Sequence, residues 1–160
     1  LASAKQNSRW DRMPPALRKQ RILLLDALSS TVTARSCVLV HGDATGENVL
    51  AGQDSGGLFP ILIDFADSGF APPFYELPPV LFDLFRFDPV AGGTFLSLYA
   101  EDYGISTEIV IQELTAAFLA HDFSPDYLHA AALHASLPGN ASLRAYTKAI
   151  RDYVTYALSI

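Results

Sequence analysis

The stretch VLVHGDATGENVLAGQDSGGLFPILID, which runs from Val38 to Asp64, decides the fold and the chemistry expected of this chain. Its apolar runs at residues 38–40, 49–51 and 59–63 predict three short strands, the first of them buried. The turn-rich residues 52–57 join the last two runs and contain no lysine, so they predict a hairpin loop and not a phosphate-binding loop. The stretch therefore predicts a small hairpin sheet with polar residues at its base.

Three polar side chains flank this hairpin. Asp43 and Asn48 lie at its entrance, and Asp64 lies at its exit. A phosphoryl-transfer site needs a carboxylate that orients or deprotonates the attacking hydroxyl, together with an amide oxygen and a second carboxylate for Mg²⁺. The three residues have these types in this chain order, and their spacing matches D-x-x-x-x-N followed by the Asp of D-F-G. The pattern predicts a Mg²⁺-phosphate site.

The segments HGDATGEN and LIDFADSGFAPPFYEL together resemble the C-terminal lobe of the aminoglycoside phosphotransferase and choline-kinase-like family. The resemblance implies a protein-kinase-like fold that uses ATP and Mg²⁺. It implies that Asp43 is the catalytic base, that His41 is a structural member of the catalytic loop, and that Asn48 and Asp64 bind Mg²⁺. The acceptor would be the hydroxyl group of a small molecule.

Two positions depart from the family pattern. Glu76 stands where the family usually has the Asp of a Y-D-L segment that buttresses the catalytic loop, and Ala71-Pro72-Pro73 replaces a common G-D-P. Asp67 is a second acid after Asp64 and is a candidate for a substrate contact or for a turn. The stretch YELPPVLFDLFRFD also bears a weaker resemblance to the phosphotransferase-type domains of F-box and JmjC proteins.

Composition and charge narrow the class of protein. The chain has 160 residues, of which 50% are hydrophobic, and this length suits one domain or one lobe of a larger one. The net charge of −6 gives no basic surface for nucleic acid. No apolar run is long enough to span a membrane and no signal-peptide pattern is present, so we expect an intracellular chain, and the first residue, Leu1, indicates a piece of a longer protein. The single cysteine, Cys37, excludes a disulfide framework and is expected to be buried.

The rest of the chain reads as mostly helical. Residues 1–13 are a polar lead-in that packs Trp10, Pro14-Pro15 begins a helix, and residues 29–33 form a loop before the first strand. Residues 68–73 are expected to form an irregular loop, because they contain one glycine and two prolines. Residues 75–87 are apolar on most faces and predict a central core helix. Further helices are predicted at residues 89–103 (ending at Gly104), 106–121 (beginning at Ser106), 126–137 and 140–158. His121, His129 and His134 lack the spacing of a helical zinc site and are expected to be ordinary histidines.

Together these patterns predict a single α+β domain over residues 1–160, the C-terminal lobe of a kinase-like fold. The residues before Val38 look helical and do not resemble the β-rich lobe that clamps ATP, so we expect that lobe to be absent from this chain. A missing N-terminal lobe or a partner chain would then supply the clamp. The chain would be the catalytic-loop and Mg²⁺-binding half of a small-molecule kinase and inactive alone. The alternative is a kinase-shaped binding or scaffold module whose site is inert. Acidic residues in the helical region would suit a cationic acceptor, and a solvated helix face explains them equally well.

Overall fold

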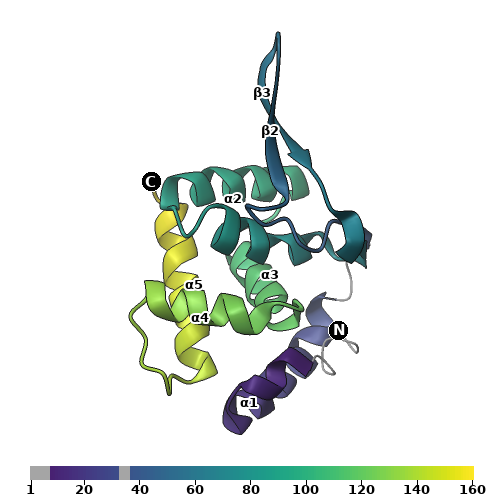
Figure 1. Cartoon of the computed structure of the whole chain (residues 1–160). Helices are drawn as coiled ribbons and strands as arrows, with labels where there is room; N and C mark the ends of the chain where they lie inside the picture. Colours follow the sequence, from purple (N-terminus) through teal and green to yellow (C-terminus); the bar gives the residue numbers. More distant parts are fainter. Residues whose placement is uncertain (1–7, 33–36) are drawn as a thin grey trace.

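The computed structural model describes residues 8–32 and 37–160, and over these it is a mostly helical α+β structure with two small sheets (Figure 1). The order of elements is η2 (Ser8–Arg12), α1 (Pro15–Val32), β1 (Val38–Val40), β2 (Val49–Asp54), β3 (Gly57–Leu62), η3 (Phe65–Asp67), β4 (Gly69–Ala71), η4 (Pro73–Glu76), η5 (Pro79–Leu84), α2 (Pro89–Tyr103), α3 (Thr107–Ala120), α4 (Ser124–His134) and α5 (Leu143–Ala157).

Helix α3 is the centre of the core. It contacts α1, α2, α4, α5 and η4, and Val110, Leu114 and Leu119 on it are fully buried. The helix begins at the predicted N-cap Ser106, and α2 ends at the predicted Gly104, whose φ of 60° allows the left-handed cap. Both of these predicted helix ends are confirmed.

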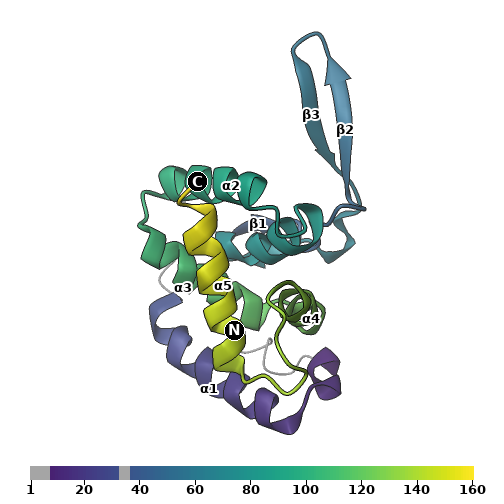
Figure 2. The ribbon, with the colours of Figure 1, turned by 90° about the vertical axis from the view of Figure 1, so that its left-hand side faces the viewer.

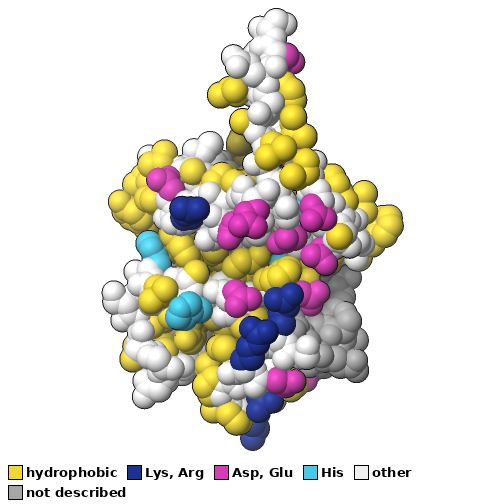
Figure 3. Space-filling model, viewed as in Figure 1, with side chains coloured by type: hydrophobic (Ala, Val, Ile, Leu, Met, Phe, Trp, Pro, Cys, Tyr) yellow, Lys and Arg dark blue, Asp and Glu magenta, His cyan; other side chains and the backbone are white. Residues whose placement is uncertain are grey.

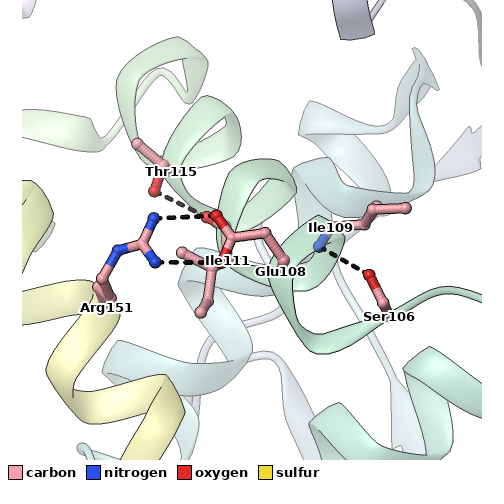
Figure 4. A network of polar contacts seen from close by, with 6 residues as sticks. All are labelled: Ser106, Glu108, Ile109, Ile111, Thr115 and Arg151. Carbon is pink, nitrogen blue, oxygen red and sulfur yellow. Dashed lines mark hydrogen bonds and ion pairs between the residues drawn. The ribbon is translucent and has the colours of Figure 1, made fainter.

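Helix α5 is joined to α3 by an ion pair at the surface. The Arg151 guanidinium donates two hydrogen bonds to the Glu108 carboxylate, at 3.0 and 3.1 Å, so that the planar groups face each other (Figure 4). Both side chains are about half exposed, so the pair fixes geometry and adds little stability. The buried face of α5, which includes Ile150 and Val154, supplies most of what holds it to the body.

The segment at residues 75–87 is buried in the core and helical as predicted, but it is not one continuous helix. The segment is a short 3₁₀ helix, η4, followed by the π-helix η5, in which the Phe85 amide donates to the Val80 carbonyl at 2.9 Å. Pro78 and Pro79 have no amide hydrogen, so they cannot supply α-helical bonds within this segment. Leu77 and Leu81 are nevertheless buried at 1% and 0% exposure, as expected of a core element.

The two sheets are separate. Strands β2 and β3 form the predicted hairpin, from the pair Val49–Leu62 to the pair Asp54–Gly57, and every residue of β3 is exposed. The hairpin therefore stands out from the helical body (Figure 2). Strand β1 pairs with β4 instead, with Val40 opposite Gly69. Residues 69–71 are thus a strand and not part of an irregular loop, because the backbone of β1 offers them a partner.

Several local expectations need correction. The first strand is not buried as a whole: Val40 is 5% exposed, whereas Leu39 is 65% exposed, because the two-stranded sheet β1–β4 leaves one face open. Cys37 is exposed and not buried. Helix α1 continues through residues 29–31, which were expected to form a loop, and residue 33 lies outside the described residues. The lead-in segment does pack Trp10, which is 2% exposed under the Arg21 guanidinium.

Candidate active site

His41 ties the loop between β1 and β2 to the exit of the hairpin. Its Nδ1 accepts a hydrogen bond from the Asp43 amide at 3.3 Å, so the ring proton lies on Nε2, which donates to the Ile63 carbonyl at 2.8 Å. The ring also packs against Phe65, with centroids 4.6 Å apart, and the side chain is 5% exposed. These contacts give His41 the means to fix the loop that carries Asp43.

Gly42 is required by the geometry of this loop. Its φ is +86°, and a Cβ atom at this position would overlap with the carbonyl oxygen of Asp67. Its amide donates to Glu76 Oε1 at 2.7 Å, so the longer side chain of glutamate reaches the loop from η4. Burial raises the pKa of Glu76, and the hydrogen bond from Gly42 acts in the opposite direction. Glu76 thus contacts the loop at the point where a buttress is expected.

Asp43 and Asn48 are in direct contact. The Asn48 side-chain amide donates both to the Asp43 carbonyl and to Asp43 Oδ2, at 2.9 Å each. Burial raises the pKa of Asp43, the negative charge of Asp67 raises it further, and His41 and the Asn48 hydrogen bond lower it. A half-buried carboxylate with a raised pKa and a free edge is a suitable proton acceptor.

Asp64 lies beside this pair at the end of the hairpin. The Ile63 amide donates to the Asn48 carbonyl at 3.0 Å, so Asp64 directly follows the residue opposite Asn48. Asp64 has the left-handed conformation, with φ 57° and ψ 73°, which is uncommon for a residue other than glycine and is found at functional sites. Its exposed carboxylate accepts a hydrogen bond from the Ala66 amide at 3.3 Å.

The donors fit a Mg²⁺ ion that keeps water and phosphate ligands. Because the Asn48 amide group faces Asp43, its Oδ1 is left to face elsewhere, and the Asp64 carboxylate has an open edge. Mg²⁺ is commonly held by one or two protein oxygens plus substrate phosphates. Residues 8–32 and 37–160 contain no group of three or more His, Cys, Asp or Glu placed to hold a metal by themselves. The Mg²⁺ assignment of Asn48 and Asp64 stays a prediction.

Sequence reasoning did not find Asp83. Its Oδ1 accepts a hydrogen bond from the Gly46 amide at 2.8 Å and so holds the middle of the catalytic loop. Asp83 and Asp43 line one cavity of about 480 Å³, whose other lining residues are Thr45, Gly46, Glu47, Arg86, Phe123, Asp126 and Tyr127. Acidic side chains gather on the body near the base of the hairpin (Figure 3). An acid inside the apolar run LFDLF was the available signal for Asp83.

Asp67 lies on the other side of the loop. It lines a second cavity, of about 350 Å³, together with Gly42, Tyr75, Asp122 and further residues of η2 and the α3–α4 turn. Its charge acts on the pKa of Asp43, so it lies near the predicted base. A contact between Asp67 and a substrate stays a prediction.

His121 has surroundings unlike those of an ordinary surface histidine. It ends α3, is fully buried and stacks on Tyr75, the neighbour of Glu76, with ring centroids 4.3 Å apart. Burial lowers its pKa to about 4, although the backbone of Gly42 favours the protonated ring. No local sequence pattern marks this position, because the contact depends on the packing of α3 against η4.

Comparison with known proteins identifies the family of this chain. Residues 1–117 match the model of the phosphotransferase enzyme family, APH. No curated protein and no solved structure matches the chain. None of the helices in the described part of the chain combines the length and apolar character needed to cross a membrane.

Proposed function

The chain belongs to the phosphotransferase enzyme family, and we propose that it forms the catalytic-loop and Mg²⁺-binding half of an ATP-dependent kinase for a small-molecule hydroxyl. Family membership implies a kinase-like fold. The observation that carries the proposal is the contact of Asn48 with Asp43, 2.9 Å from the amide nitrogen to the carboxylate, at the base of the hairpin that delivers Asp64. These are the parts needed on the metal and base side of a phosphoryl-transfer site.

Each residue has a defined task in this proposal. Asp43 accepts the proton of the acceptor hydroxyl. At the same time the hydroxyl oxygen bonds to the γ-phosphorus of ATP, and the bond between that phosphorus and the leaving ADP breaks. Asn48 and Asp64 would hold Mg²⁺, which supplies neutralising charge to the β- and γ-phosphates. His41 and Glu76 keep the loop in place through the Ile63 carbonyl and the Gly42 amide.

The acidic lining of the cavity beside Asp43 favours an acceptor with a positive charge. Asp83, Glu47 and Asp126 line it with Asp43, against one cation, Arg86, among its described lining residues. An amino alcohol or amino sugar would place its ammonium group among these carboxylates and its hydroxyl toward Asp43.

The exposed hairpin is evidence for a second lobe or a partner chain on the opposite side of the site. Large apolar side chains on it are exposed by 40% or more, namely Leu50, Leu58, Phe59, Ile61 and Leu62. Exposed apolar groups this close together mark an interaction surface. We propose that an N-terminal lobe, or another chain in its place, covers this hairpin and clamps ATP against it.

A catalytically inert scaffold is the second candidate. It is favoured by one observation: within the described residues, the segment before β1 consists of η2 and α1 and holds no strand that could roof a nucleotide. An inert module would have no physical need for the Asp43–Asn48 contact, so we place it second.

A transfer assay distinguishes the two candidates. The form of the protein that carries both lobes, or this chain with its partner, is given ATP labelled at the γ-phosphate, Mg²⁺ and a panel of amino alcohols and neutral polyols. We expect Mg²⁺-dependent labelling of a cationic acceptor, lost in the double variant Asn48→Ala, Asp64→Ala. Tight nucleotide binding without any labelled product would favour the scaffold.

A further inference from the structure

Two neighbouring buried side chains, His121 and Tyr127, each carry a polar atom that makes no hydrogen bond of standard geometry within the described residues. These atoms are His121 Nε2 and the Tyr127 hydroxyl oxygen. His121 is fully buried and Tyr127 is 6% exposed, and their rings meet edge to face with centroids 5.3 Å apart. A buried polar group without a partner destabilises the folded state, so two adjacent ones need an explanation.

His121 presents a donor to the loop. The Phe123 amide donates to His121 Nδ1 at 3.2 Å, so in the neutral ring the proton lies on Nε2. The ring stacks on Tyr75 at an interplanar angle of 24°, and the next residue, Glu76, holds the Gly42 amide. The backbone of Gly42 is also the group that acts against the effect of burial on the pKa of His121. The stacking on Tyr75 and this effect of Gly42 together indicate that the His121 ring faces the backbone of Gly42.

Tyr127 presents a second donor on the Asp43 side. It lines the same cavity as Asp43 and Asp83. Burial raises the pKa of Tyr127, and the largest electrostatic contribution to this rise is the charge of Asp43. The hydroxyl therefore stays protonated near the carboxylate of the predicted base.

We propose that His121 and Tyr127 are positioning residues: they form a floor under the Gly42–Asp43 peptide unit and set the place of the Asp43 carboxylate. Glu76 and His41 hold the same unit through hydrogen bonds of 2.7 and 3.3 Å. The floor adds contacts from α3 and α4, which are anchored in the core. The catalytic part of the proposal rests on the proposed kinase function, in which a small displacement of the base lowers the rate strongly.

Variants of His121 separate its two nitrogens. His121→Gln keeps a donor near the place of Nε2, and His121→Asn keeps an acceptor near the place of Nδ1. Both lose the ring stacked on Tyr75, so they are matched for packing. Tyr127→Phe removes the hydroxyl and keeps the ring. His129→Asn, at an exposed position of α4, is the control.

The anchoring is measured by amide hydrogen exchange of the 160-residue chain, read by NMR. We expect exchange of the Gly42 and Asp43 amides to rise about tenfold in His121→Asn and in Tyr127→Phe, the fold-change that corresponds to about 1.4 kcal/mol of lost anchoring. His121→Gln and His129→Asn should stay within about threefold of the wild type. Unchanged exchange at both amides in His121→Asn and Tyr127→Phe would overturn the floor. An equal rise in α5 amides such as Val154, in His121→Gln as well, would show a packing role instead.

The catalytic consequence is measured separately in the transfer-competent form. We expect kcat to fall about tenfold in His121→Asn and Tyr127→Phe with KM for ATP unchanged, and His121→Gln to restore it. A changed exchange pattern with unchanged kcat would refute the positioning of the base. The expected exchange pattern in a protein without phosphotransfer would refute the kinase function and leave the floor standing.

Discussion

The side-chain amide of Asn48 donates to two oxygens of Asp43, the backbone carbonyl and one carboxylate oxygen, at 2.9 Å each. This arrangement holds the Asp43 side chain against its own main chain through one nitrogen of Asn48. The second carboxylate oxygen of Asp43 is left for a substrate proton, and Asn48 Oδ1 is left for a metal. The same contact therefore leaves one oxygen of Asp43 for the predicted role as base and one oxygen of Asn48 for the predicted role as metal ligand.

We predict that Asp43→Asn lowers turnover by roughly two to four decades in the transfer-competent form, the usual contribution of a positioned base. The fold should persist, because the new amide can still accept from Asn48. The measurement is kcat with ATP and acceptor saturating, and Asp102→Asn on the exposed side of α2 is the control. Activity within a fewfold of the wild type would remove the base assignment.

We predict that Gly42→Ala destabilises the protein by about 1–3 kcal/mol, because alanine is strained at a φ of +86° and its Cβ would overlap with the Asp67 carbonyl. Gly139→Ala is the matched control, since a Cβ there meets no atom within 4 Å. Urea unfolding of both variants checks this. Equal free energies of unfolding for the two would mean that the loop is not held as described.

We predict that Glu76 makes the free energy of unfolding depend on pH. Burial raises its pKa above the ordinary value of 4.5, so ionisation of Glu76 costs native stability. Its contribution is fully present below 4.5 and is lost as the pH rises through the higher pKa of the folded state. His41 and Asp43 also act on the pKa of Glu76 and are kept in both proteins, so the wild type is compared with Glu76→Gln.

Relative to Glu76→Gln, the wild type should therefore lose stability as the pH rises above 4.5. Urea unfolding at several pH values measures this difference, and Glu101→Gln on α2 is the control. A difference that stays constant with pH, or that moves in favour of the wild type, would contradict the raised pKa.

We predict that the 160-residue chain alone binds ATP and Mg²⁺ weakly and transfers little phosphate. Asn48 and Asp64 can hold the metal, but the exposed hairpin gives adenine and ribose one open face, and tight small-molecule sites bury most of their ligand. Calorimetric titration with ATP and Mg²⁺ is the measurement. Micromolar affinity with measurable turnover would show that this chain completes the site by itself.

The sequence predicted those parts of the fold that depend on local patterns. The N-cap at Ser106, the cap at Gly104 and the hairpin turn each follow from a few neighbouring residues, and the structure has all three. Asp43 and Asn48 were predicted only to lie at the entrance of the hairpin, and the structure adds the hydrogen bond between their side chains.

The parts that failed depend on partners far along the chain. The pairing of β1 with β4 joins residues 38–40 to residues 69–71, and no local pattern marks it. The sequence predicted a core helix over residues 75–87 without its division into the 3₁₀ helix η4 and the π-helix η5, because an apolar run has no feature that separates helix types. Asp83 and His121 reach the loop from the helical part of the chain, so their roles needed the packing of η5 and α3.

The hairpin and the predicted site share the same residues at their junction. The Ile63 carbonyl accepts from His41 and the Ile63 amide donates to the Asn48 carbonyl, while Asp64 follows as the next residue. The hairpin therefore meets the body at the residues predicted to hold the metal and to carry the base. A partner that binds β2 or β3 and tilts them would turn Asn48 and Asp64 relative to Asp43, so binding at the distant tip would move the oxygens that are predicted to face the phosphates.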